Sequence, residues 1–394
     1  MTAGTRAPEV RDGRCDGRAA LTAVGTVYAL QGFGYAVVST SLPSFQLRLS
    51  LDATTIAVIL LGVCVASAAG SVVADLVAVR ADSRRAVQIG FGVQAFGTVA
   101  LAVAPGTSAF VAAAAVYGTG LGMVDAASSM QGVLVQRRLG RLVLGRCFAF
   151  YTGGAVVGGL TMSLVLSVSG AAAALVCAAV AHASFSVFGV RFLDPARAAQ
   201  ARPKDGSGKR DGLPGAPVLA TGVIVLAAFT IDSGISTWSA VHLTGLGLTA
   251  TLAPSGYIAY QVGVLVARLA TDTLIRRFGF GVLLTGASLS GVAGGLVVML
   301  VPGPVAAVLG FTVSGLAVGV LVPVAFDAAG RILPERSDEV IARVNLFNYV
   351  GAVLGAVGVG VLVDLAGAPA AFQLPVVVLA VAWLVTRRVP VHNG

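Results

Sequence analysis

The sequence predicts an all-α polytopic membrane protein with about twelve transmembrane helices in two pseudo-symmetric bundles of six. Three observations lead to this prediction. Of the 394 residues, 57% are hydrophobic and only 11% are charged, whereas a soluble protein has roughly 25% charged residues. Apolar runs near the length of a membrane-spanning helix follow one another along the chain, and they are too long for the strands of a barrel. The two halves of the chain also repeat each other.

The apolar runs and the polar stretches between them define the expected domains. Residues 1–18 are polar and arginine-rich, which predicts a disordered cytoplasmic tail. Residues 193–217 contain Pro, Gly and mixed charge, which favours a cytoplasmic linker. The linker separates an N-terminal bundle (19–192) from a C-terminal bundle (218–388), and 389–394 form a second cytoplasmic tail. We expect spans at about 20–42, 54–78, 87–104, 108–134, 148–168, 171–191, 218–241, 253–275, 281–301, 304–329, 344–366 and 370–387.

The distribution of positive charge predicts the orientation. All of the 26 lysines and arginines except Arg48 and Arg268 fall in segments that would lie on the same side of the membrane as the N-terminus. This asymmetry predicts cytoplasmic termini in a bacterial inner membrane, and it does not resemble a nucleic-acid-binding surface. Shifting the number of spans by one would destroy it.

Two separate matches indicate an internal repeat. Asp272 and Arg277 follow Asp75 and Arg80 by 197 positions, and the segment 351–356 follows the similar segment 154–159 by the same offset. Parallel repeats of six spans suit a transporter that rocks about a central site near the membrane midplane.

With these features the chain resembles the major facilitator superfamily of transporters. The resemblance rests on the 6+6 repeat, the charged linker and a Gly/Asp/basic motif after spans 2 and 8. The second copy of that motif is well kept, whereas in the first copy Asp82 stands where Gly279 aligns. The motif residues are Gly70, Asp75 and Arg80 in the first copy and Asp272, Arg276, Arg277 and Gly279 in the second.

Finer stretches resemble a poorly characterised bacterial permease subgroup. In that subgroup span 7 has an acid six residues before W-S-A-V, as in Asp232 and 238–241, and span 4 has an acid before an amide-rich stretch, as in Asp125 and Gln131. Ser129 stands where the subgroup tends to have Asn. The span 5 signature of the antiporter subgroup is only partly present, because Gly159 replaces its proline.

Asp232 and Asp125 are the candidate proton-coupling residues. An ionisable group inside a span costs at least about 2.5–3.5 kcal/mol, so it usually lines a cavity or pairs with another group. Ser236 and Ser239 share a helix face with Asp232, as on a cavity wall. The alternative for each acid is a hydrogen bond that joins neighbouring helices.

The remaining candidates divide into gating and cavity residues. Asp75, Arg80, Arg268, Asp272, Arg276 and Arg277 are interpreted as gating or structural, with Arg268 either pairing with Asp272 or attracting an anionic substrate. Asp327 is expected to pair with Arg331 one turn later. The cavity candidates, besides the two serines, are polar or aromatic, although a tyrosine near a helix end is often an interfacial anchor. They are Gln31, Phe33, Tyr35, Gln131, Tyr151, Tyr257, Tyr260, Gln261, Asn345, Asn348 and Tyr349.

The function predicted from these residues is proton-coupled export of a small, partly apolar molecule. A proton-coupled importer of a sugar or organic acid would use the same acids, and a non-transporting sensor or scaffold is the alternative of another class. H-E-x-x-H, G-x-S-x-G and Walker A motifs are absent from the sequence, which disfavours an enzyme. The scattered Cys and His residues predict no metal site or disulfide, and we expect no cofactor. The expected partners are lipid, protons and a small-molecule substrate, without nucleic acid, and the expected state is a monomer.

Overall fold

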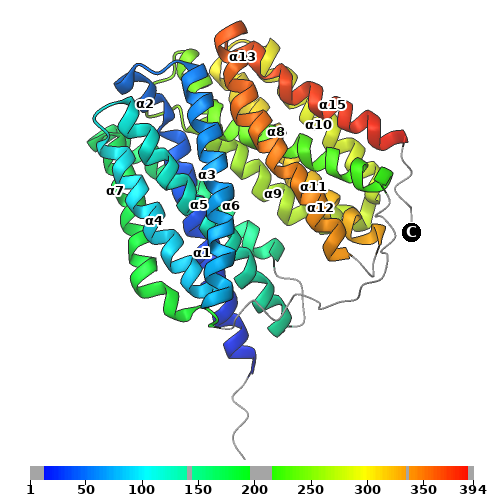
Figure 1. Ribbon diagram of the computed structural model, residues 1–394. Helices are drawn as coiled ribbons and strands as arrows, with labels where there is room; N and C mark the ends of the chain where they lie inside the picture. Colours follow the sequence, from blue (N-terminus) through cyan, green and yellow to red (C-terminus); the bar gives the residue numbers. More distant parts are fainter. Residues whose placement is uncertain (1–12, 140–143, 196–214, 334–336, 389–394) are drawn as a thin grey trace, which may run out of the picture.

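The computed structural model describes residues 13–139, 144–195, 215–333 and 337–388, and every regular element in these ranges is helical (Figure 1). The first half contains α1 (Gly13–Thr40), α2 (Leu42–Leu49), α3 (Ala53–Arg80), α4 (Ser83–Val103), α5 (Thr107–Leu139), α6 (Leu144–Ser169), α7 (Ala171–Ser184), the π-helical turn η1 (Phe185–Gly189) and the 3-10 turn η2 (Val190–Phe192). The second half contains α8 (Gly215–Gly245), α9 (Ser255–Phe278), α10 (Phe280–Leu300), α11 (Pro304–Ile332), α12 (Ser337–Val353), the π-helical turn η5 (Leu354–Gly358), α13 (Val359–Ala366), α14 (Ala368–Ala371) and α15 (Gln373–Arg388).

The spans agree with the predicted number. Within the described ranges, 11 helical segments are long and apolar enough to cross a membrane. The helix α9 has 24 residues but is not among them, because Gln261, Arg268 and other polar side chains interrupt its apolar sequence. Counted with α9, the described chain contains the twelve spans that the sequence predicts.

The structure corrects the sequence prediction at three boundaries. The helix α1 begins at Gly13, so residues 13–18 are helical and are not part of a disordered tail. The helix α2 occupies a stretch that was expected to be a connection, and Pro43 in its first turn favours helix initiation there. The helix α8 begins at Gly215, within the predicted linker. The rest of that tail, residues 196–214 of the linker and the tail 389–394 lie outside the described residues.

Arg48, one of the two exceptions to the charge asymmetry, has a local structural role. It lies on α2, and its guanidinium donates hydrogen bonds to the carbonyl oxygens of Ala102 (2.7 Å) and Leu101 (3.1 Å) at the end of α4. It also lies 5.3 Å from the centroid of the Phe45 ring. Arg48 therefore satisfies carbonyls that the end of α4 leaves without helical partners.

Close glycine contacts extend the repeat to the packing of both halves. In α5 and α6, four glycines face backbone carbonyl oxygens of α3 and α1 so closely that a Cβ atom would not fit, and the glycines 197 positions later face the equivalent carbonyls. The pairs are Gly118–Val63 and Gly315–Tyr260, Gly122–Ser67 and Gly319–Val264, Gly154–Ala29 and Gly351–Leu226, and Gly158–Phe33 and Gly355–Thr230. The offset found in the sequence is thus also the offset of the helix crossings.

The helices α3 and α13 of the two halves meet at one end of the molecule, and α3 and α12 diverge toward the other. In Figure 1, α3 and α13 lie side by side at the top, whereas α12 runs away from α3 toward the lower right. The backbone N–H of Thr54 on α3 donates to the carboxylate of Asp364 on α13. A Cβ atom on Gly360 of α13 would lie 2.9 Å from the Cβ of Ala57 on α3. We call this meeting of α3 and α13 the closed end.

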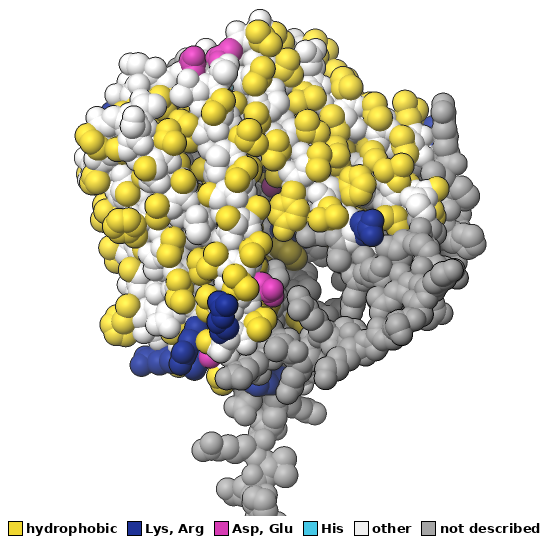
Figure 2. Space-filling view, viewed as in Figure 1, with side chains coloured by type: hydrophobic (Ala, Val, Ile, Leu, Met, Phe, Trp, Pro, Cys, Tyr) yellow, Lys and Arg dark blue, Asp and Glu magenta, His cyan; other side chains and the backbone are white. Residues whose placement is uncertain are grey.

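The flank of the molecule is apolar, as expected for a surface in lipid. Figure 2 shows hydrophobic side chains over most of the visible face, with most of the visible Lys and Arg side chains at the lower end. Large apolar side chains such as Leu164 (70% exposed) and Val168 (85% exposed) lie fully at the surface. An exposed apolar surface of this extent indicates contact with a membrane.

Candidate functional site

Asp232 lies in the middle of α8 and contacts the neighbouring helix α9. The hydroxyl of Tyr260 donates a 2.7 Å hydrogen bond to Asp232 Oδ1. Tyr260 is fully buried, whereas Asp232 is partly exposed. A tyrosine hydroxyl that donates to a carboxylate in apolar surroundings compensates part of the cost of placing the acid there.

The two serines that follow Asp232 are buried more deeply than the predicted cavity wall would place them. Ser236 and Ser239 are 2% and 0% exposed, and their hydroxyl oxygens have no hydrogen-bond partner among the described residues. His242 continues the same spacing and is also buried, with both ring nitrogens unpartnered in the described chain and its ring packed edge-on against Phe311 and Phe372. His242 is not among the site residues predicted from the sequence, although its three-residue spacing from Ser239 is visible there.

The adjacent side of α8 is fixed to the helix α12 and to η5. Ser233 Oγ donates to the carbonyl of Ala352 (2.8 Å), and Trp238 Nε1 donates to the carbonyl of Ala356 (2.8 Å). Ala356 lies within the π-helical turn, where the altered hydrogen-bond pattern frees backbone carbonyls. These contacts fix the orientation of α8 and therefore the direction in which Asp232 points.

Asp125 forms the corresponding polar contact in the first half. Gln31 Nε2 on α1 donates to Asp125 Oδ1 (2.8 Å) and to the carbonyl of Leu121 (3.2 Å). Gln31 is buried, and the Asp125 side chain is exposed. Each half therefore contributes one acid, and each acid accepts a hydrogen bond from a neutral side chain of an adjacent helix.

Tyrosines from both halves gather around the two acids. Tyr35 and Tyr151 of the first half each interact electrostatically with both Asp125 and Asp232. Tyr257 of the second half interacts with Tyr35 and accepts a 2.8 Å hydrogen bond from Gln261 Nε2. The structure thus brings these sequence-predicted candidates into one region between the halves.

Arg268 connects the two halves. Its guanidinium donates to Thr152 Oγ1 (2.6 Å) and to the carbonyl of Phe148 (3.1 Å), both on α6, and it lies 5.8 Å from the centroid of the Phe148 ring. It also interacts electrostatically with Asp232. The side chain of Asp272 lies outside the described residues, so the predicted pairing of Arg268 with Asp272 has no structural description. Gly159 allows the same two helices to approach farther along, because a Cβ there would lie 2.6 Å from Ile258.

A cavity of about 80 Å³ lies beside this region, and all of its lining residues except Thr237 belong to the first half. Most of its wall is apolar, and its polar residues are Tyr35, Ser39, Tyr117 and Thr237, the last from α8. Tyr117 is buried, and its hydroxyl has no partner among the described residues. The apolar lining residues are Val38, Leu42, Phe45, Ile56, Ile59, Leu60, Val63, Leu101, Phe110, Ala114 and Leu121.

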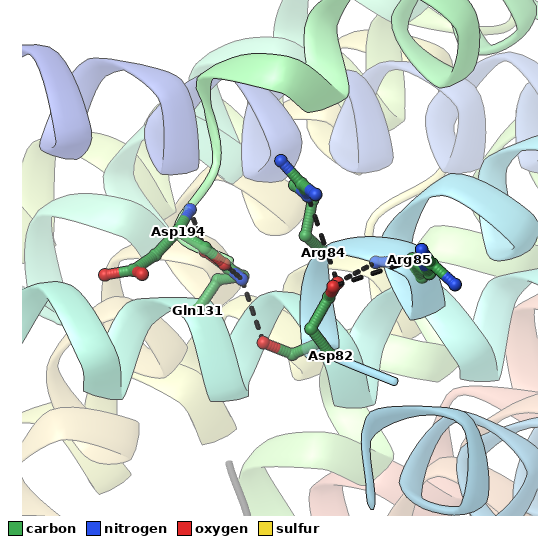
Figure 3. Close-up of polar contacts among 6 residues, drawn as sticks. Asp82, Arg84, Arg85, Gln131 and Asp194 are labelled. Atoms are coloured by element: carbon green, nitrogen blue, oxygen red, sulfur yellow. Dashed lines mark hydrogen bonds and ion pairs between the residues drawn. The ribbon is translucent and has the colours of Figure 1, made fainter. Parts of the chain in front are cut away.

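Gln131 lies in a different environment from the one predicted. Its side chain is fully buried and donates to Ser83 Oγ (2.8 Å) and to the carbonyl of Asp194 (2.8 Å), and it accepts from the backbone N–H of Asp194 (3.1 Å) (Figure 3). Arg138 pairs with the Asp194 carboxylate. Gln131 therefore attaches the start of the linker segment to α5 and α4, and it is unsuited to line a substrate cavity.

The remaining cavity candidates occupy varied positions. Phe33 is partly buried and packs against the hydrophobic core. Asn348 is partly buried. Tyr349 is 54% exposed and interacts electrostatically with Asp125. The side chain of Asn345 lies outside the described residues.

The two copies of the Gly/Asp/basic motif have different turns. Asp82 has φ −162° and caps α4 by accepting from the N–H of Arg85 (2.7 Å), with the Arg84 guanidinium 3.9 Å from its carboxylate (Figure 3). Gly279 at the equivalent position has φ 77°, which favours glycine. The replacement of Gly by Asp in the first copy is therefore accompanied by a different backbone conformation, extended at Asp82 and left-handed at Gly279.

The other motif and charge candidates are at the surface. Asp75 and Arg80 are exposed. Arg276 donates to Thr273 Oγ1 (3.3 Å), and the Arg277 guanidinium lies 5.3 Å from the centroid of the Phe278 ring. The predicted pair Asp327–Arg331 is confirmed at 2.8 Å.

Two six-helix units with a central polar region define a polytopic membrane transporter. The family model of the Major Facilitator Superfamily matches residues 24–314, and the chain belongs to that superfamily. It is similar to an uncharacterized MFS-type transporter of Yersinia pestis, with 24% identity over 91% of this chain and 94% of that protein. It is also similar to an uncharacterized transporter of Sinorhizobium fredii, with 26% identity over 68% of this chain and 71% of that protein.

Solved structures share the fold. A mutant of the nucleoside transporter NupG has a TM-score of 0.74 at 13% identity, covering 93% of this chain and 99% of that chain. An inward-facing, occupied bacterial homolog of the human lysosomal transporter Spinster has a TM-score of 0.72 at 13% identity, over 93% of this chain and 95% of that chain. The E. coli fucose:proton symporter FucP has a TM-score of 0.58 at 14% identity, over 93% and 97%. Membership of the superfamily makes the chain a multi-pass membrane transporter and not a member of an enzyme family.

Proposed function

We propose that this transporter couples the export of a small, partly apolar molecule to proton movement, with Asp232 as the proton carrier. The observation that carries the proposal is the Tyr260–Asp232 hydrogen bond of 2.7 Å in the middle of α8. A carboxyl group in this position is neutral when protonated and charged when deprotonated, so its cost in apolar surroundings changes with each proton that it takes up. Such a group can link a conformational change to proton binding.

Asp125 is the second candidate for the same role. Its hydrogen bond from Gln31 gives the first half an acid with a similar environment. Arg268 supports an electrostatic link between Asp232 and the first half. Its guanidinium is hydrogen-bonded to α6 and interacts electrostatically with Asp232. The closed end and the divergence of α12 from α3 support alternating access by rocking of the two bundles (Figure 1).

The proposed location is a bacterial inner membrane with both termini and the linker in the cytoplasm. In this proposal the linker (193–217) separates the N-terminal bundle (19–192) from the C-terminal bundle (218–388). Arginine-rich segments on the side of the N-terminus support it. The closed end would then face away from the cytoplasm.

Proton flux in proteoliposomes tests the proposed function. A pH dye is enclosed, a proton gradient is imposed and candidate compounds are added to the wild type, to Asp232→Asn and to Asp125→Asn. We expect a compound-triggered flux that Asp232→Asn abolishes, with a direction that indicates exchange. Asp327→Asn is the matched control, because Asp327 is exposed and pairs only locally with Arg331.

Other outcomes would change the proposal. Flux that persists in Asp232→Asn but is lost in Asp125→Asn would transfer the coupling role to Asp125. Proton and compound moving together would make the protein an importer of the sugar or organic acid type. Compound binding without any transport would favour the sensor or scaffold.

A further inference from the structure

Some residues that line the cavity beside Tyr35 differ in polarity from the residues 197 positions later. In the first half the cavity wall includes Ser39, Leu42 and Phe45. The positions 197 residues later are Ser236, Ser239 and His242, so two apolar residues are replaced by polar ones. The small apolar pocket in the second half, lined in part by Ile235, Phe311 and Ser314, has a volume of only about 10 Å³. The first half therefore offers apolar volume, and the second half offers polar groups.

Two buried hydroxyl groups of α8 have no hydrogen-bond partner within the described chain. Ser236 and Ser239 are at most 2% exposed, and their hydroxyl oxygens are unpartnered within the described chain. Asp232 stands one turn before Ser236 on the same face of α8. Tyr35, its repeat equivalent in the first half, lines the cavity and interacts electrostatically with Asp232. Tyr35 thus joins the apolar cavity to the polar face of α8.

The charges in this region favour a cation. The described groups are the carboxyls of Asp232 and Asp125 and the guanidinium of Arg268. Arg268 already donates to Thr152 and to the Phe148 carbonyl. With both carboxyls deprotonated, two negative charges stand against one positive charge, so the net charge of the region is negative, and its natural partner is an ammonium group that donates hydrogen bonds.

We propose that the substrate is a small amphipathic amine whose ammonium group binds at Asp232 and whose apolar chain enters the cavity beside Tyr35. This inference rests on the proposed transport function and specifies its substrate class. The cavity of about 80 Å³ has roughly half the volume of an engineered cavity that binds benzene. It therefore accommodates a short alkyl chain of about three or four carbons and excludes a large ring system.

Binding of homologous alkyl compounds tests the proposal. Purified protein in nanodiscs is titrated with n-alkylamines, n-alcohols and n-alkyl carboxylates from two to eight carbons, and binding is followed by thermal stabilisation. We expect the amines to bind at least about tenfold more tightly than alcohols of equal length, because a charge-assisted hydrogen bond is lost in the alcohol. Amine affinity should rise about fourfold per methylene up to the length that fills the cavity and then level off.

Variants separate the two parts of the site. Asp232→Asn should remove the preference for amines over alcohols while keeping the dependence on chain length. Ala114→Leu fills the cavity and should shorten the preferred chain, whereas Leu60→Ala enlarges it and should lengthen the preferred chain. Because the two variants should shift the preferred chain length in opposite directions, a folding defect in one of them would not produce the expected pair of results.

Three results would overturn the proposal. Equal binding of alcohols and amines would remove the charged contact, and a preference for carboxylates would indicate that Arg268 selects an anion. An unchanged chain-length profile in both cavity variants would place the chain elsewhere. Failure of the proposed function is distinguishable from failure of this proposal. Amine binding without proton flux would contradict the proposed function alone. Asp232-dependent flux driven by a different compound, without amine binding, would contradict the amine proposal alone.

Discussion

Substitution of Gly360 by alanine should open the closed end. A Cβ at position 360 would lie 2.5 Å from Trp238 Cζ2 and 2.9 Å from Ala57 Cβ, so both contacts must be relieved. Trp238 is 1% exposed, and its Nε1 is bonded to the Ala356 carbonyl at 2.8 Å. Ala57 belongs to α3 in the other half. The contact with Trp238 lies within the second half and needs a shift of the indole, whereas the contact with Ala57 is relieved by separation of α3 from α13.

The magnitude follows from the cost of overpacking. An extra methyl group in a well-packed contact costs about 1–3 kcal/mol. If separation of the helices relieves this cost, the equilibrium between the closed and open arrangements shifts by about 5- to 150-fold. A transporter that must close this end in every cycle should also turn over more slowly.

The distance between two spin labels measures this shift. Val58 on α3 (63% exposed) and Leu365 on α13 (75% exposed) can be replaced by labelled cysteines in a background whose native cysteines are alanine. The Gly360→Ala protein should show a larger population at long distance. Gly286→Ala is the control, because a Cβ there meets no atom within 4 Å. A folded Gly360→Ala protein with an unchanged distance distribution would refute the reasoning.

Two further predictions concern the closed end and the orientation. Asp364→Ala should shift the equilibrium between the closed and open arrangements by only about two- to fivefold, since a carboxylate at an exposed helix N-terminus contributes about 0.3–1 kcal/mol. Asp52→Ala, which removes the 2.7 Å cap on the Thr55 N–H within one half, should lower the stability of the protein by about 1 kcal/mol and leave the spin-label distances unchanged. Equal shifts of the equilibrium in both variants would contradict the interpretation. An alkaline phosphatase reporter fused after Gly394 should be inactive, because both termini are expected in the cytoplasm, and an active reporter would reverse the orientation.

The parts of the fold that could be predicted from sequence depend on composition and local spacing. Span length, arginine distribution and a constant offset are properties of the chain that need no knowledge of contacts. The Asp327–Arg331 pair was predictable for the same reason, because its partners are one helical turn apart. The helix α2 was missed because eight residues are too few to give a clear apolar period.

The contacts of the site depend on tertiary structure. Tyr260 is 28 positions from Asp232, and Gln31 is 94 positions from Asp125, so neither pairing follows from local spacing. For Gln131, the position in the sequence suggested a role that the structure contradicts. Its position near Asp125 suggested a shared cavity, but its amide reaches Ser83 and the backbone of Asp194. An amide has donors and acceptors on both sides, and sequence alone does not say which neighbours satisfy them.

The repeat explains why the scaffold was easier to predict than the site. The glycine crossings are kept in both halves because they set the distance between helix backbones, and rocking of two similar bundles depends on those distances. The side chains that face the centre have diverged, as Tyr35 and Asp232 illustrate. A site with identical walls would present the same chemistry twice and could not hold an amphipathic molecule in one orientation. Divergence at the lining positions, within conserved crossings, is therefore what a directional binding site on a duplicated fold requires.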